Sequence, residues 1–237
     1  MKLAFVDYRI SVEEHKNLSK YVDKIILVPK NTNLYPAING HPDIQLTLIN
    51  EQYISLIVSK DIDKSFIDEI NNLGVSFEYS TNSLKSNYPF DIPLNCLFMK
   101  NFFIHTLANS DKKLLDLAKN KININVNQGY TKCSTVIVNE RALITSDKGI
   151  YNKLSSYDFD ILLINPGNIE LPGLDYGFIG GCTGLIEENK LAFYGNLDFH
   201  PQGNEIKKFL TKHHVEPVYL YNGPLIDRGS IFTLSDI

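Results

Sequence analysis

Short apolar segments alternate with short amphipathic segments along the whole chain. In most repeats two apolar runs come first, a segment with helical spacing follows, and a further apolar run ends the unit. This order predicts hairpin, helix and strand units. The expected helices cover residues 11–22, 61–74, 110–120, 147–157 and 200–214. The first of them begins with a predicted capping box, in which Ser11 precedes Glu14 by three positions.

The expected strands occupy the apolar runs between these helices. They cover residues 2–6, 24–28, 43–49, 53–58, 75–80, 96–99, 102–107, 122–127, 134–138, 142–146, 161–165, 183–187, 191–195, 217–221 and 229–234. Hairpin turns are expected at Asn50-Glu51, Lys100-Asn101, Asn139-Glu140 and Glu188-Asn189. The first strand has no hairpin partner and the last has no helix after it, so the two ends of the chain supply the halves of one unit. We expect them to pair, which removes exposed strand edges.

The repeat is also visible in the amino acids themselves. Residues 133–144 superpose without a gap on residues 182–193, which aligns Cys133 with Cys182. A supersecondary unit that recurs every roughly 37 to 53 residues is typical of propellers and repeat arrays. We therefore predict an α+β fold: one five-bladed β/α propeller domain over residues 1–237, closed by pairing of the N- and C-terminal strands.

Composition and charge narrow the function. Of 237 residues, 43% are hydrophobic, which suffices for a packed core. The formal charge of -4 includes no basic block, so we expect neither nucleic acid nor membrane partners. No apolar run approaches the ~20 residues of a membrane span and no signal-like segment opens the chain, so we predict a cytoplasmic protein. A small-molecule ligand is the expected partner, association of identical subunits stays open, and no cofactor is predicted.

The repeat brings residues from distant units to the centre of the ring. The positions where the chain enters the inner strands hold His41 with Asp43, Asn95 with Cys96, Lys132 with Cys133, Gly181 with Cys182, and Asp227 with Arg228. A thiol, an imidazole and carboxylates that converge in this way form the usual framework of a cysteine nucleophile. We propose Cys133, His41 and Asp43 as catalytic candidates, and Asp227, Arg228, Asp175 and Cys182 as ligand-binding candidates.

Each candidate also has a purely structural interpretation. His41 precedes Pro42 and could simply fill a turn, and Asp43 is expected to begin a strand, where an acidic residue is unusual unless it is used. Cys133 follows Lys132 but would point to the other face of a strand, so a buried inert thiol is the alternative. Asp175 lies in a turn-forming Gly-Leu-Asp-Tyr-Gly segment.

Metal binding has little support in the sequence. The three cysteines, at 96, 133 and 182, do not form a disulfide framework, and the spacing contains neither C-x₂-C nor H-x₃-H pairs. Zinc could be held only by a site that the ring assembles from cysteines and His41. We predict reduced thiols and no metal.

Four segments carry a resemblance to a known family. "NGHPDIQ" (39–45), "QGYTKCS" (128–134), "ITSDKGI" (144–150) and "LINPGNIELPGLDYGFIGG" (163–181) resemble an uncharacterised bacterial family of the pentein, or guanidino-group-modifying enzyme, fold. The resemblance covers essentially the whole chain. It implies a five-bladed β/α propeller like that of amidinotransferases and deiminases, which attack a guanidinium carbon with a cysteine thiolate, assisted by a histidine and by carboxylates.

The chain departs from these enzymes where their nucleophile is found. That residue lies in the last blade, near the C-terminus, but here "NGPLIDRGSIFTL" (222–234) places Asp227, Arg228, Gly229 and Ser230 in that region. We therefore carry two hypotheses. In the first hypothesis the protein is a pentein that binds a small polar ligand, guanidinium-type ligands included, and acts on it as a cysteine-dependent hydrolase. The alternative is a binding or interaction module without catalysis, because penteins also include a ribosome anti-association factor.

Overall fold

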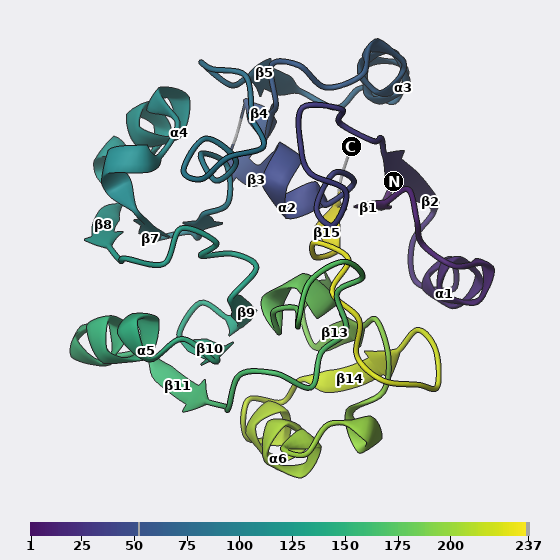
Figure 1. Cartoon of the computed structure of the whole chain (residues 1–237), viewed down its shortest axis with the longest axis vertical. Helices are drawn as coiled ribbons and strands as arrows, with labels where there is room; N and C mark the ends of the chain where they lie inside the picture. Colours follow the sequence, from purple (N-terminus) through teal and green to yellow (C-terminus); the bar gives the residue numbers. More distant parts are fainter. Residues whose placement is uncertain (52, 236–237) are drawn as a thin grey trace.

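The computed structural model describes residues 1–51 and 53–235. It has a mixed α+β fold with five three-stranded sheets arranged around a common centre (Figure 1). The sheets are β15-β1-β2 (Phe232–Leu234, Leu3–Asp7, Lys24–Val28), β3-β4-β5 (Leu46–Glu51, Ile54–Val58, Phe77–Tyr79), β6-β7-β8 (Leu97–Phe98, Phe102–His105, Ile122–Asn125), β9-β10-β11 (Thr135–Asn139, Ala142–Thr145, Asp160–Leu163) and β12-β13-β14 (Thr183–Glu187, Lys190–Phe193, Glu216–Tyr219).

All five sheets have the same internal order. The inner strand pairs antiparallel with the middle strand, and the middle strand pairs parallel with the outer one. Parallel neighbours need a crossover connection, and a helix supplies it in each sheet. These helices are α1 (Val12–Leu18), α3 (Lys64–Asn72), α4 (Lys112–Leu117), α5 (Lys148–Leu154) and α6 (Gly203–Lys212), all on the periphery in Figure 1. The predicted hairpin, helix and strand units are confirmed.

The two ends of the chain meet in one sheet, as expected. β15 runs antiparallel to β1, with Leu3 opposite Leu234 and Phe5 opposite Phe232. The inner strands also follow one another around the centre, since β3 lies against both β15 and β6, and β12 lies against both β9 and β15. No strand ladder joins one sheet to another within residues 1–51 and 53–235, so the five sheets remain separate units.

Side-chain caps fix several helix starts. The predicted capping box of α1 is present, because Ser11 Oγ accepts a hydrogen bond from Glu14 N while the Glu14 carboxylate accepts one from Ser11 N. At α3, α4 and α5, the side chains of Asp63, Asp111 and Asp147 each accept a hydrogen bond from a backbone N–H of the first turn, without the reciprocal bond of a capping box. None of the described helices has the length and apolar character that a membrane crossing requires.

Several predicted boundaries were wrong near the centre of the ring. Asp43 does not begin a strand: Pro42–Gln45 form a helical turn, α2, because proline is well suited to a first helical position. β12, by contrast, begins at Thr183 as predicted, directly after a 3₁₀ turn formed by Gly180–Cys182. β15 begins at Phe232 rather than at residue 229, since Gly229 and Ser230 have φ values of +71° and +72°. The chain therefore turns sharply just before it enters these inner strands.

The predicted hairpin turns agree with the structure in part. Glu188-Asn189 connects β12 and β13 as expected, whereas Asn139 is still the last residue of β9. At the predicted Asn50-Glu51 turn, β3 continues through Glu51, and the following residue 52 lies outside the described residues.

Apolar residues pack between neighbouring sheets and under the helices. Phe5 of β1 packs against Phe66 of α3, with ring centroids 6.2 Å apart. The centre is different, because His41, Asp43 and Asp227 are all buried there. Buried charged groups are costly unless something compensates them, so the centre is where a functional site is expected.

Candidate functional site

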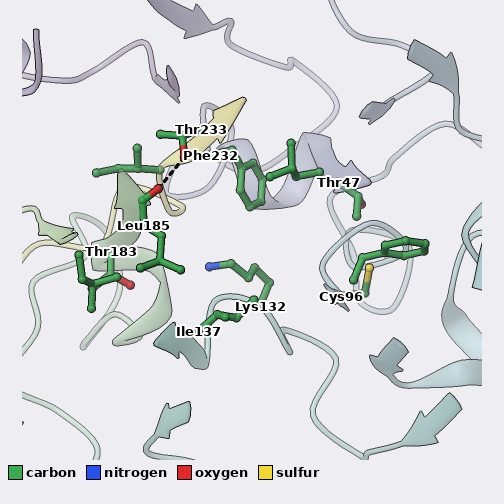
Figure 2. A pocket seen from close by; sticks show the side chains of 13 residues that line it. Thr47, Cys96, Lys132, Ile137, Thr183, Leu185, Phe232 and Thr233 are labelled. Atoms are coloured by element: carbon green, nitrogen blue, oxygen red, sulfur yellow. Dashed lines mark hydrogen bonds between the residues drawn. The ribbon is translucent and has the colours of Figure 1, made fainter. Parts of the chain in front are cut away.

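The five inner strands line a small pocket at the centre (Figure 2). Its volume is about 140 Å³, and each inner strand contributes at least one residue: Leu48, Phe98, Ile137, Leu185 and Phe232. Lys132 enters this mostly apolar space, where its ammonium group lies 5.7 Å from the centroid of the Phe232 ring. Cys96 also lines it, and burial raises the pKa of that thiol to about 12. Cys96 is therefore an inert thiol.

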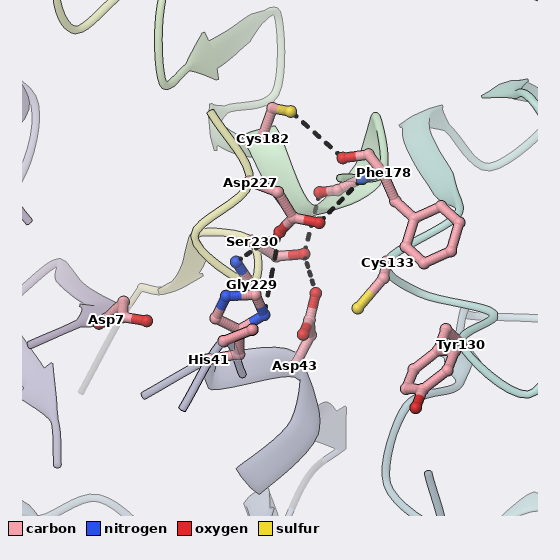
Figure 3. Close-up of polar contacts among 12 residues, drawn as sticks. Asp7, His41, Asp43, Tyr130, Cys133, Phe178, Cys182, Asp227, Gly229 and Ser230 are labelled. Atoms are coloured by element: carbon pink, nitrogen blue, oxygen red, sulfur yellow. Dashed lines mark hydrogen bonds and ion pairs between the residues drawn. The ribbon is translucent and has the colours of Figure 1, made fainter. Parts of the chain in front are cut away.

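Next to this pocket, His41, Asp43 and Cys133 come together (Figure 3). A ring nitrogen of His41, a carboxylate oxygen of Asp43 and Cys133 Sγ all lie within 4.8 Å of one another. Asp227 Oδ1 is 3.9 Å from His41 Nδ1. All four side chains are at most 3% exposed. Four of the seven residues predicted for the site, His41, Asp43, Cys133 and Asp227, therefore lie close together.

A buried asparagine holds the segments that carry these residues. Asn95 Nδ2 donates to the backbone oxygen of Asp43 at 2.8 Å and to Cys133 Sγ at 3.0 Å. Its Oδ1 accepts from the backbone nitrogens of Lys132 and Cys133. Asn95 therefore joins α2 to the turn before β9. Sequence reasoning placed it near the centre but gave it no role.

The Asp43 carboxylate has one tethered oxygen and one untethered oxygen. Ser230 Oγ donates to Asp43 Oδ2 at 2.6 Å, and Lys132 Nζ donates to Ser230 Oγ at 2.9 Å. Asp43 Oδ1 and both ring nitrogens of His41 lack hydrogen-bond partners among the described residues. Buried polar atoms of this kind are normally paired, so their lack of partners marks this cluster as a candidate ligand site.

Asp227 is held by backbone donors instead. Its carboxylate accepts hydrogen bonds from the backbone nitrogens of Phe178, at 2.8 Å, and Gly229, at 3.0 Å. Burial raises the pKa of Asp227, although the nearby His41 opposes this shift. The backbone therefore fixes the position of the Asp227 carboxylate, but little positive charge nearby compensates its negative charge.

The local electrostatics keep Cys133 in the thiol form. Burial is the largest cause that raises its pKa well above the ordinary value, and the charges of Asp43 and Asp227 add to it. Burial also lowers the pKa of Lys132, against the attraction of Asp43. A positive charge placed beside the two carboxylates would reverse their effect on Cys133, because it stabilises the thiolate.

A second pocket, of about 250 Å³, opens onto these groups. His41, Cys133 and Asp227 line it together with Tyr35, Ile38, Tyr130, Leu171, Leu174, Asp175, Tyr176 and Phe178. The rings of Tyr130 and Phe178 are stacked, with centroids 6.1 Å apart. An apolar, aromatic wall with a few convergent polar groups is the usual form of a small-molecule site. We call this space the aromatic pocket.

The remaining predicted residues have different places. Asp175 lines the aromatic pocket. Cys182 does not line it; its Sγ donates to the backbone oxygen of Phe178 at 3.2 Å, and burial raises the pKa of its thiol well above the ordinary value. Arg228 is directed to Glu14, with Nε 3.0 Å from Oε1, rather than to the pocket. Of the two equivalent cysteines, Cys133 is the one that lies beside His41.

Two glycines give the site residues their space. A Cβ at Gly181 would lie 1.9 Å from Asp227 Oδ1, and a Cβ at Gly229 would lie 2.2 Å from that of His41. Gly229 also has a φ of +71°, which disfavours other residues. The glycine-rich segment that contains Gly181 is thus a close-packed support for Asp227 rather than a phosphate-binding loop.

Gly181→Ala is expected to displace Asp227 and to destabilise the protein by about 1 to 3 kcal/mol, the usual range for overpacking. Thermal unfolding measures this, and Gly149→Ala in α5 is the control, because its new methyl group meets only the Asp147 side chain, at 3.0 Å. Equal melting temperatures for the two variants would contradict the close packing.

Comparisons with known proteins place the chain in a family. Among curated proteins, none matches the sequence. Solved structures that it resembles include SxtG, an amidinotransferase from Microseira wollei in the saxitoxin biosynthetic pathway, at 10% identity and a TM-score of 0.49, covering 92% of this chain and 87% of that one. Another is the C. jejuni agmatine deiminase, at 13% identity and a TM-score of 0.47, covering 72% and 64%. A family model matches residues 5–232, so the chain belongs to DUF6873, a family of unknown function.

Proposed function

We propose that this protein is a pentein-type β/α propeller that binds a small guanidinium-type cation in the aromatic pocket and hydrolyses it with Cys133 as nucleophile. One observation carries the proposal. Cys133 Sγ, a ring nitrogen of His41 and a carboxylate oxygen of Asp43 lie within 4.8 Å of one another beside a pocket of about 250 Å³. Nucleophile, base and carboxylate are thus within reach of one bound molecule.

Charge and shape favour a planar cation. Asp43 and Asp227 bring two buried carboxylates to the site, and Asp43 Oδ1 has no partner in the described part of the chain. A guanidinium group offers several N–H donors in one plane, which matches carboxylates well. The stacked rings of Tyr130 and Phe178 add faces that attract a cation. A neutral ligand would add no positive charge beside Asp227, and an anionic ligand would be repelled by both carboxylates.

The proposed reaction has two stages. When the cation binds, Cys133 gives its proton to His41 and the thiolate forms a C–S bond with the guanidinium carbon. One C–N bond then breaks, and the amine leaves with the proton from His41. A water molecule next forms a C–O bond at the same carbon and the C–S bond breaks. One proton of the water restores the thiol, and its second proton passes to the released amine through solvent, which leaves a neutral ureido product. The carboxylates of Asp43 and Asp227 hold the remaining nitrogens in both stages.

The test follows the covalent intermediate. The purified protein is incubated with agmatine, arginine or dimethylarginine in the presence of EDTA, and is then analysed by peptide mass spectrometry and assayed for ureido products. We expect an adduct on Cys133 with at least one compound, and its absence in Cys133→Ser. Cys182→Ser, which removes the equivalent thiol outside the pocket, should retain it. Product formation without a Cys133 adduct, or no product with any compound, would contradict the hydrolase.

The alternative function is ligand binding without catalysis. It is favoured by the raised pKa of Cys133 and by Ser230, which stands in the C-terminal segment where the related enzymes carry their thiol. Calorimetric titration with the same cations separates the two functions. If the protein is a binding module, the wild type and Cys133→Ser should bind the cations with equal affinity, and Asp43→Asn should not bind them.

A further inference from the structure

The cluster of His41, Asp43 and Cys133 has a second chemical capacity that the proposed function does not use. It brings together one imidazole nitrogen, one carboxylate oxygen and one sulfur. We propose that these three side chains bind a zinc ion and leave its fourth coordination position open to the aromatic pocket. Three protein ligands with one open position are typical of zinc sites that interact with small molecules, whereas purely structural sites have four.

The distances fit this coordination. Zinc bonds of about 2.0 to 2.3 Å in tetrahedral geometry separate the ligand atoms from one another by roughly 3.3 to 3.8 Å. The three donor atoms here lie within 4.8 Å of one another, so side-chain movements of about 1 Å bring them into place. The donors come from two segments, α2 with the residue before it and the turn before β9, and Asn95 ties these segments together.

The hydrogen bonding leaves the right atoms available. Both ring nitrogens of His41 and the Oδ1 atom of Asp43 are buried and lack partners among residues 1–51 and 53–235. Buried polar atoms are rarely left in this state, so they call for a further ligand. Asp43 Oδ2 accepts a hydrogen bond from Ser230, so Oδ1 is the oxygen that remains available to coordinate a metal ion.

The surrounding groups provide the outer shell that zinc sites normally have. Ser230 donates a hydrogen bond to the Asp43 carboxylate, and Asn95 Nδ2 lies 3.0 Å from Cys133 Sγ. Such partners orient metal ligands and strengthen binding. On binding, the S–H bond of Cys133 breaks, a Zn–S bond forms and the proton goes to solvent. Zinc then carries two positive charges against one thiolate and the Asp43 carboxylate.

The test uses the full-length protein, stripped of metal with EDTA and freed of the chelator, and zinc alone as the ligand. Competition with a chromophoric chelator gives affinity and stoichiometry, and unbuffered titration measures released protons. We expect one zinc per chain and one proton released. Cys133→Ser and Asp43→Asn should each weaken binding at least tenfold, while Cys182→Ser binds as the wild type does.

A second readout does not depend on the variants. Cobalt bound at the same site should give a thiolate charge-transfer band and strong visible absorption of a tetrahedral ion, and zinc should abolish both. Zinc affinity that is unchanged in Cys133→Ser, or cobalt spectra without the thiolate band, would overturn the proposal. The hydrolase is assayed in EDTA, so either proposal can fail while the other stands.

Discussion

Replacement of Lys132 by methionine is expected to destabilise the protein by about 3 to 5 kcal/mol, the range measured when the loss of one buried charge leaves an opposite buried charge uncompensated. Lys132 is buried, and its ammonium group is linked to the Asp43 carboxylate through Ser230. Methionine has a similar length and no charge, so the variant leaves Asp43 without this compensation. Chemical denaturation followed by circular dichroism measures the change.

The double variant Lys132→Met/Asp43→Asn is the control for this experiment. It removes both charges, so it should recover a clear part of the stability lost in the single variant. A loss below about 1 kcal/mol in Lys132→Met, or no recovery in the double variant, would mean that Lys132 does not compensate Asp43. The link between Lys132 and Asp43 would then contribute little to the free energy of unfolding.

Acid is expected to weaken the fold through His105. This histidine is buried, its Nε2 lies 3.1 Å from the backbone oxygen of Gly129, and burial lowers its pKa from 6.5 to about 4. Between these two pH values the unfolded chain binds a proton that the folded chain does not. The contribution of His105 is therefore complete above pH 6.5 and decreases as the pH falls toward 4, by up to about 3 kcal/mol.

Denaturation curves at pH 7 and at pH 4.5 test this expectation. His105→Gln should be less stable than the wild type at pH 7, because it loses the packing of the buried imidazole ring. Its stability should, however, change less between the two pH values. An equal loss in both proteins would assign the acid sensitivity to other groups. The His105 ring contacts the backbone oxygen of Gly129, which precedes Tyr130 of the aromatic pocket. The loss of stability at low pH should therefore also affect the aromatic pocket.

Much of the site was predictable because the repeat fixes which residues meet. Cys133 aligns with Cys182 in the sequence, and both occupy turns that precede inner strands. Repetition therefore indicated that His41, Asp43, Cys133 and Asp227 would converge. It could not say which cysteine faces His41, because equivalent positions in a pseudo-symmetric ring differ only in their neighbours.

Other parts of the site were outside the reach of local patterns. Arg228 is adjacent to Asp227, yet it pairs with Glu14, a partner more than two hundred positions away in the sequence. The helical turn at Asp43 was not predicted because the alternating apolar residues that follow it, Leu46 and Leu48, are typical of a strand. Tyr35, Tyr130 and Phe178 form one wall from three distant segments, and no spacing in the sequence marks them as a set.

The pairing of β1 with β15 makes the site dependent on both ends of the chain. Asp227 and Ser230 immediately precede β15, whereas His41 and Asp43 follow the sheet that β1 begins. These residues come together only after the last strand has joined the first. A ribosome must therefore release residues 227–234 before the complete binding centre exists, and a substitution that stops β15 from pairing with β1 would disable a centre whose residues it never touches.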